Sequence, residues 1–215
     1  KYMVEYNGAY NGSEQFAPEY RFGFFSSGGV GWNISEEPFM KQVKGLDLLK
    51  ISASYGEVGA DNIGPDRFLF MNQWAYGDAS QLGVVGEAGD FSPYTWYRET
   101  MVGNPAVRWE TAYKYNLALD FGFLDGLIGG RLDYFQDNRQ DILMAGDRSV
   151  PSYYGTDAPA ANLGRMRTKG FELTLNFNHT FSNGIRVWAD FAMTHARDEV
   201  LFRDDPQLLH DYQKQ

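Results

Sequence analysis

The sequence lacks cysteine entirely across its 215 residues. A disulfide framework and a thiolate metal site are therefore both excluded. There is also no run of 18 or more apolar residues, which argues against a transmembrane helix. Basic residues are fewer than acidic ones, 19 against 28, and the net charge is −9. A chain with this balance offers no basic stripe for phosphates, so no nucleic-acid partner is expected.

A secretory signal is a further missing feature. The opening residues, KYMVEYNGAY, contain no apolar core followed by a small-residue cleavage site. The sequence therefore predicts that no signal peptide is present in this chain. Two interpretations follow: the protein acts in the cytoplasm, or these residues are one part of a longer protein.

Glycine and aromatic residues, in contrast, are abundant. The chain has 24 glycines, and aromatic side chains make up 16% of its residues, including 14 tyrosines. Long-helix proteins favour Ala, Glu, Lys and Leu instead. The composition thus favours β structure with many tight turns.

Residues alternate with a period of two in the stretch WETAYKYNLALDFGF, 109–123. Its odd positions are mostly aromatic or apolar, and its even positions are polar or small. This period indicates a β-strand with one apolar face. Comparable alternation predicts about seven strands, at 1–10, 21–34, 48–58, 109–123, 128–138, 169–181 and 185–196.

These strands are long, and their connections alternate between short and long. Soluble strands average ~5 to 6 residues, whereas a tilted membrane-crossing strand needs ~9 to 11. Short turns are expected at 124–126 and 182–184, and a short helix capped by Ser35 is expected after 34. Long external loops are expected at about 60–108, 140–166 and 198–215.

The predicted fold class is all-β: a segment of a membrane-spanning antiparallel β-barrel, with the whole of 1–215 belonging to the barrel domain. Closed bacterial barrels start at eight strands and have even strand numbers. An open sheet in lipid would leave bare edges. About seven strands therefore predict part of a larger barrel.

Several stretches resemble one family. They are RFGFFSSGGVGWNISEEPFMK, LLKISASYGEVGADNIGPDRF, NPAVRWETAYKYNLALDFGFLDG, LDYFQDNRQDIL and NLGRMRTKGFELTLNF. In this order and spacing they are similar to the C-terminal barrel half of the SusC/RagA-like TonB-dependent transporters of the Bacteroidetes outer membrane. The chain departs from that pattern at Ser26, where proline is common, and at Asn11, where aspartate is usual.

The resemblance implies a presumed 22-stranded barrel with a plugged lumen in the outer membrane of a Gram-negative bacterium. It implies import of oligosaccharides or peptides together with a SusD-like surface lipoprotein. It also implies coupling to the TonB complex through an N-terminal region that is missing from this chain. It implies neither a cofactor nor catalysis.

Two sets of candidate residues follow. Aromatic side chains of the 60–108 loop are predicted to contact substrate or the lipoprotein lid, since flat rings stack on sugars and cover area well; packing within the loop is the alternative. Polar strand positions are predicted to face the lumen. The first set is Trp74, Tyr76, Tyr94, Trp96 and Tyr97; the second is Glu110, Lys114, Asn116, Asp120, Glu172, Asn176, Arg186 and Asp190.

Other interpretations stay open from the sequence. A soluble carbohydrate-binding module or an outer-membrane barrel enzyme are alternatives, as is a transporter relative used for adhesion or signalling. Asp137 and Asp141 could be considered as an acid–base pair. Histidines 179, 195 and 210 show no metal-ligand spacing. Trp109 and Phe123 are expected in aromatic girdles at the two membrane interfaces.

Overall fold

The computed structural model describes residues 1–64, 66–76, 97–145 and 158–204. Within these residues the helices and strands are β1 (Tyr2–Gly12), β2 (Phe22–Asn33), η1 (Ile34–Glu36), β3 (Leu46–Ala60), β4 (Gln73–Tyr76), β5 (Tyr97–Met101), β6 (Glu110–Phe123), β7 (Ile128–Met144), β8 (Ala161–Thr180) and β9 (Arg186–Phe202). Over the same residues, no helix has the length and apolar character needed to span a membrane.

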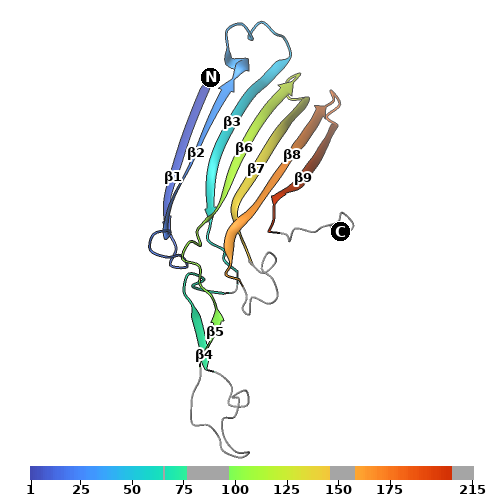
Figure 1. The fold of residues 1–215 in the computed structure, drawn as a ribbon. Coiled ribbons are helices and arrows are strands. Elements are labelled where there is room, and N and C mark those ends of the chain that lie inside the picture. The colour runs from blue at the N-terminus through green and yellow to red at the C-terminus, as the bar shows by residue number, and fades with distance from the viewer. Residues whose placement is uncertain (65, 77–96, 146–157, 205–215) are drawn as a thin grey trace, which may run out of the picture.

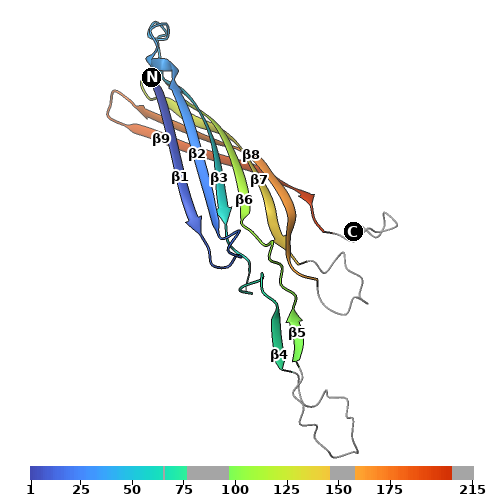
Figure 2. The same ribbon diagram turned by 60° about the vertical axis from the view of Figure 1, so that its left-hand side comes forward.

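Seven of the strands form one antiparallel sheet in the order β1-β2-β3-β6-β7-β8-β9. Each strand of this sheet pairs with the next one along the chain, except that β4 and β5 lie between β3 and β6 in the sequence and pair with each other. Figures 1 and 2 show a single tilted and twisted layer, with β1 and β9 at its two edges. The predicted seven-stranded antiparallel barrel segment is confirmed.

The strand bounds differ from the sequence prediction at the loop end. β7 continues to Met144 and β8 begins at Ala161, so the expected 140–166 loop is partly strand. β9 likewise continues to Phe202. A bulge explains the missed residues: the β7–β8 register shifts between Arg139 and Ile142, and Asp141 has a φ of 57°. An extra residue in a strand breaks the period of two on which the prediction relied.

The two faces of the sheet have opposite character. On the outer face, as we call the apolar one, Leu132 lies between Leu119 and Leu173 on the neighbouring strands, and the rings of Tyr55 and Tyr115 are 5.0 Å apart. Many of these side chains are exposed, including Leu117 at 52%. A continuous apolar surface of this size is unsuited to water and suits the hydrocarbon of a bilayer.

Tight turns join the strands at one end, which we call the turn end and which is uppermost in Figure 1. Leu124, Asp125 and Gly126 all have positive φ values, of 59°, 55° and 79°. The backbone N–H of Gly126 donates to the carboxylate of Asp47 at 2.9 Å. This contact ties the β6–β7 turn to the start of β3.

The prediction that Ser35 caps a short helix between β2 and β3 is wrong. The helix is a 3-10 turn over Ile34–Glu36, so Ser35 lies inside it, and its hydroxyl donates to Asn33 at 2.7 Å. Glu37 follows as a buried carboxylate that accepts from the Trp32 indole at 3.2 Å and pairs with Lys1 at 3.3 Å. The hydrogen bond from Trp32 is the main reason that the pKa of Glu37 lies below its usual value.

The loop end holds a small hydrophobic core outside the sheet. Phe16, Ile63, Leu69 and Val107 are buried there, although they come from three separate connections. Trp109 joins this core: its ring lies 5.3 Å from those of Phe16 and Phe25. The prediction of Trp109 as a lipid-facing girdle residue is therefore wrong, because β6 begins only at Glu110 and the residue before it turns into the core.

Candidate functional site

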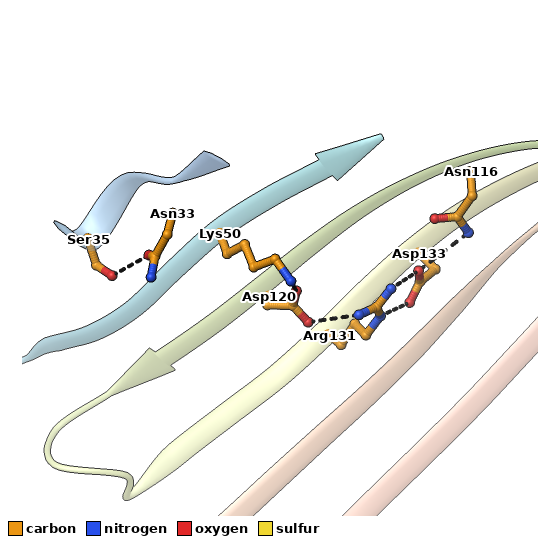
Figure 3. A network of polar contacts seen from close by, with 7 residues as sticks. All are labelled: Asn33, Ser35, Lys50, Asn116, Asp120, Arg131 and Asp133. Atoms are coloured by element: carbon orange, nitrogen blue, oxygen red, sulfur yellow. Dashed lines mark hydrogen bonds and ion pairs between the residues drawn. The ribbon is translucent and has the colours of Figure 1, made fainter. Parts of the chain in front are cut away.

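The polar face of the sheet carries a connected network of charged side chains (Figure 3). Asp120 lies directly opposite Lys50 on β3 and Arg131 on β7, at 3.8 and 3.2 Å. Arg131 also makes a two-point contact with Asp133 at 2.7 and 2.9 Å, and Asn116 donates to the same carboxylate at 3.4 Å. Strand register brings Lys50, Asp120 and Arg131 together, since cross-strand neighbours share a face. Asp133 follows two residues after Arg131 and so lies on the same face of β7.

A second group lies nearer the loop end. Lys114 pairs with Asp137 on the adjacent strand at 3.1 Å. Arg139 lies 3.7 Å from the same Asp137 carboxylate and 4.0 Å from Glu110. Partly exposed pairs of this kind contribute little to stability. They place the side chains of Lys114 and Arg139 beside carboxylates on the polar face.

On the polar face of β8 and β9, side chains contact each other through asparagine amides rather than through ion pairs. Asn176 donates to Asp190 at 2.7 Å, and Arg186 donates to Asn178 at 2.9 Å. Glu172 lies opposite Thr194 on one side and Asp133 on the other. Like charges placed opposite each other favour an aqueous setting over a dry one.

All eight predicted lumen-facing residues lie on this one face, as the strand pairing requires. The structure connects three of them, Lys114, Asn116 and Asp120, to partners that the prediction omitted. These partners are Lys50, Arg131, Asp133 and Asp137. The alternation with a period of two also assigns these four residues to the polar face, so the sequence pattern was sufficient to include them in the prediction.

Small residues hollow the polar face next to the network. Gly29 and Gly31 on β2 face Ser54 and Ser52 on β3, and the resulting groove has a volume of about 520 Å³. Its other lining residues are Met3, Val4, Glu5, Val30, Lys50, Ala53, Asn116 and Arg131. Side chains this short leave backbone accessible on a sheet surface.

A polar cluster fastens the loops at the rim of the sheet. Arg108 donates to Asp141 at 2.9 Å, which raises the pKa of the guanidinium above its usual value. The Asn162 side chain accepts from the Arg108 N–H at 2.9 Å and donates to the Arg108 carbonyl at 2.8 Å. Asn104 adds a bond to the carbonyl of Ala160 at 3.0 Å. The segment before β6 is thereby bound to the start of β8.

The proposed acid–base use of Asp137 and Asp141 finds no support in this geometry. Asp141 is bound to Arg108 and Asp137 to Lys114. Both carboxylates therefore serve as partners of cations.

The β4–β5 hairpin projects beyond the rim, away from the turn end (Figures 1 and 2). Strand pairing places Trp74 opposite Glu99 and Tyr76 opposite Tyr97, so the three aromatic residues share one face. The two tyrosine rings are 4.9 Å apart, and all three side chains are at least 60% exposed. The other two predicted contacts, Tyr94 and Trp96, lie outside the described residues.

No group of metal-binding side chains occurs among the described residues. His179 and His195 instead pack against Phe181 and Phe171, at 4.4 and 5.5 Å between ring centroids. His210 lies outside the described part of the chain. Within that part, the candidate functional surfaces are the polar face and the aromatic hairpin.

Comparison with known proteins gives a consistent result. Residues 2–211 match the family described as TonB dependent receptor-like, beta-barrel. TonB-dependent receptor P3 of Formosa agariphila is 30% identical over 88% of this chain and 18% of its own length. TonB-dependent receptor SusC of Bacteroides thetaiotaomicron is 30% identical over 82% of this chain and 17% of its own length.

Solved structures share the fold. The RagAB peptide importer in its open-open state aligns with a TM-score of 0.77 and 20% identity, over 93% of this chain and 20% of the other. Its closed-closed state gives a TM-score of 0.75 with the same coverage. The chain thus spans about a fifth of the length of the proteins that it resembles.

Proposed function

The chain belongs to the TonB-dependent receptor-like β-barrel family, and from this membership we propose that the whole protein is a TonB-dependent transporter of the outer membrane. It would import oligosaccharides or peptides together with a SusD-like surface lipoprotein. Contact with the TonB complex would be made by residues outside this segment. The names of two similar proteins, SusC and the RagAB peptide importer, support this family of functions.

The proposal rests on one observation: the two faces of one continuous sheet differ in chemical character, one being apolar and the other charged. The outer face offers Leu117, Leu132 and Leu173 to lipid, while the polar face holds an ordered ion network around Asp120 and Arg131. A barrel wall between a bilayer and an aqueous lumen needs this division. A soluble sandwich would need a second layer to cover the apolar face.

We propose that the segment has no catalytic role. The candidate carboxylates, Asp137 and Asp141, are bound to cations, and the similar proteins are receptors and importers by name. Transport would depend on binding and on movement of parts outside this segment. The groove beside Gly29 and Gly31 is a surface on which a peptide, a sugar or a plug segment could lie against backbone.

The proposal is tested on the native protein. Detergent extracts of the outer membrane are purified through a tag on the whole protein and analysed by mass spectrometry. We expect a polypeptide several times larger than the 24.4 kDa of this segment, together with a lipoprotein. Uptake of labelled oligosaccharides and peptides should then stop when the proton-motive force is dissipated. A protein extracted without detergent, or uptake independent of that force, contradicts the proposal.

The aromatic hairpin should contact the lipoprotein or the substrate. Exchanging Trp74 and Tyr97 together for alanine removes two exposed rings from one face. Interface aromatic residues of this type contribute about 2 kcal/mol or more, which corresponds to roughly thirtyfold in affinity. Titration of the whole transporter with its lipoprotein, and separately with substrate, would show which of the two is weakened.

The matched control lies on the same hairpin. Thr100→Val keeps the size of a non-aromatic side chain at the β4–β5 register shift, while removing its bond to the Gln73 carbonyl at 3.1 Å. Both affinities should stay near those of the parent protein. Equal losses in the control and in the aromatic variant would mean that hairpin integrity matters and that the ring face does not.

A further inference from the structure

Cations gather on the outer face of β8 and β9, just beyond its aromatic residues. Phe171 lies opposite His195, and one step further toward the loop end Lys169 lies directly opposite Arg197. Alternation puts Lys169 and Arg197 on the same face as Phe171 and Leu173. Both cations are exposed.

This pair of cations is not neutralised by the strand residues around it. Among the described residues, no carboxylate lies within salt-bridge distance of Lys169 or Arg197; the adjacent Asp198 is on the polar face, where Thr168 donates to it at 2.6 Å. Glu199 lies 3.9 Å from Arg167 instead. Like charges directly opposite each other on a sheet repel.

The height of the pair relative to the bilayer follows from the strand. Apolar outer-face residues run along β8 from Phe171 and continue to Phe181, just past its end, apart from His179. Ten residues at ~3.4 Å each cover ~34 Å along the strand, and a tilt of ~35–45° reduces this to ~25 Å, the height of a lipid-facing band. Lys169 and Arg197 therefore lie at the level of lipid headgroups at the loop end.

We propose that Lys169 and Arg197 form a binding site for the phosphate-bearing headgroup of a lipid in the leaflet at the loop end. Guanidinium and ammonium groups donate strong charge-assisted hydrogen bonds to phosphate oxygens. Arg167 lies further toward the loop end and is already engaged: it donates to Asn138 at 3.1 Å and is 3.9 Å from Glu199. The acyl chains of the same lipid would lie along Leu173 and its neighbours on the outer face.

The ligand is a lipid and not a soluble phosphate because of where the cations lie. They are on the outer face, directly above Phe171 and Leu173, and not on the polar face with Asp133 and Asp190. A soluble anion would find only these two flexible, hydrated side chains there. A lipid adds burial of its chains against the apolar wall, at ~0.8 kcal/mol for each CH₂ group.

The test uses the whole transporter, purified in detergent, and native mass spectrometry of bound lipid. The probes are phosphatidic acid and diacylglycerol with the same acyl chains, which differ only in the phosphate. Lys169→Gln combined with Arg197→Gln should weaken phosphatidic acid binding about tenfold or more. Binding of diacylglycerol should not change.

The matched control removes the same charge at the other membrane surface. Lys41→Gln with Lys44→Gln changes two exposed lysines at the turn end and should leave phosphatidic acid binding unchanged. Arg197→Lys retains the charge and should retain most of the binding, which separates loss of the site from misfolding. Equal binding by the parent and the Lys169→Gln, Arg197→Gln variant would overturn the proposal. Displacement of the lipid by an equal concentration of inorganic phosphate would also overturn it.

Discussion

Leu173→Arg should destabilise the barrel by about 2–4 kcal/mol, the cost of a cation on the lipid face near the middle of a bilayer. Leu173 lies on the outer face between Leu132 and Met193, so the new charge would have apolar neighbours on both sides. The free energy of unfolding of the whole protein, measured with urea in lipid vesicles, would show the loss. Leu117→Arg should behave in the same way.

A neighbouring position supplies the control for this prediction. Thr194 is next to Met193 in sequence, but it points to the polar face and lies opposite Glu172. Thr194→Arg should change stability by less than about 1 kcal/mol, because the new cation meets a carboxylate and water. Equal losses at positions 173 and 194 would contradict the assignment of the two faces.

Phe16→Ala should have the second large effect, but a local one. The Phe16 side chain is completely buried in the loop-end core beside Val107 and Trp109. Removing a buried phenylalanine ring costs about 3–5 kcal/mol in a packed core. We expect this core to open while the seven-stranded sheet stays paired, since strand hydrogen bonds do not depend on it.

Hydrogen exchange of backbone amides measures this directly. The N–H of Asn104 donates to the Leu69 carbonyl at 2.8 Å, and the N–H of Val107 donates to Asn104 at 3.1 Å. Both should exchange roughly a hundredfold faster or more in the variant. Phe39→Ala, at an exposed position of the turn end, should leave them protected. Unchanged exchange in Phe16→Ala would show that the core does not hold the loops.

The loop-end core matters for function because it carries the aromatic hairpin. Leu69 and Val107 lie just outside the two ends of that hairpin, and the Arg108–Asn162 bonds attach the same segment to β8. An opened core would therefore release Trp74 and Tyr97 from a fixed position relative to the rim. Phe16→Ala should weaken the same contacts that the hairpin variants remove.

The sequence by itself determined the strands and the two faces of the sheet. Alternation is local: a side chain on a strand points to the face set by its position, so Leu117 and Asp120 could be assigned without knowing their neighbours. The meander order followed from short turns such as Leu124–Gly126. The family resemblance added the transporter hypothesis.

The tertiary structure alone decided which side chains meet. The contact of Asp120 with Lys50 joins strands separated by the whole β3–β6 connection, and its contact with Arg131 depends on the register of the β6–β7 pair. β7 continues past the bulge at Asp141, although the alternation with a period of two is interrupted there. Trp109 turns into a core built from three connections, and no local pattern records contacts across such sequence distances. Periodicity reports the direction of a side chain, whereas partners depend on how separate segments are brought together in space.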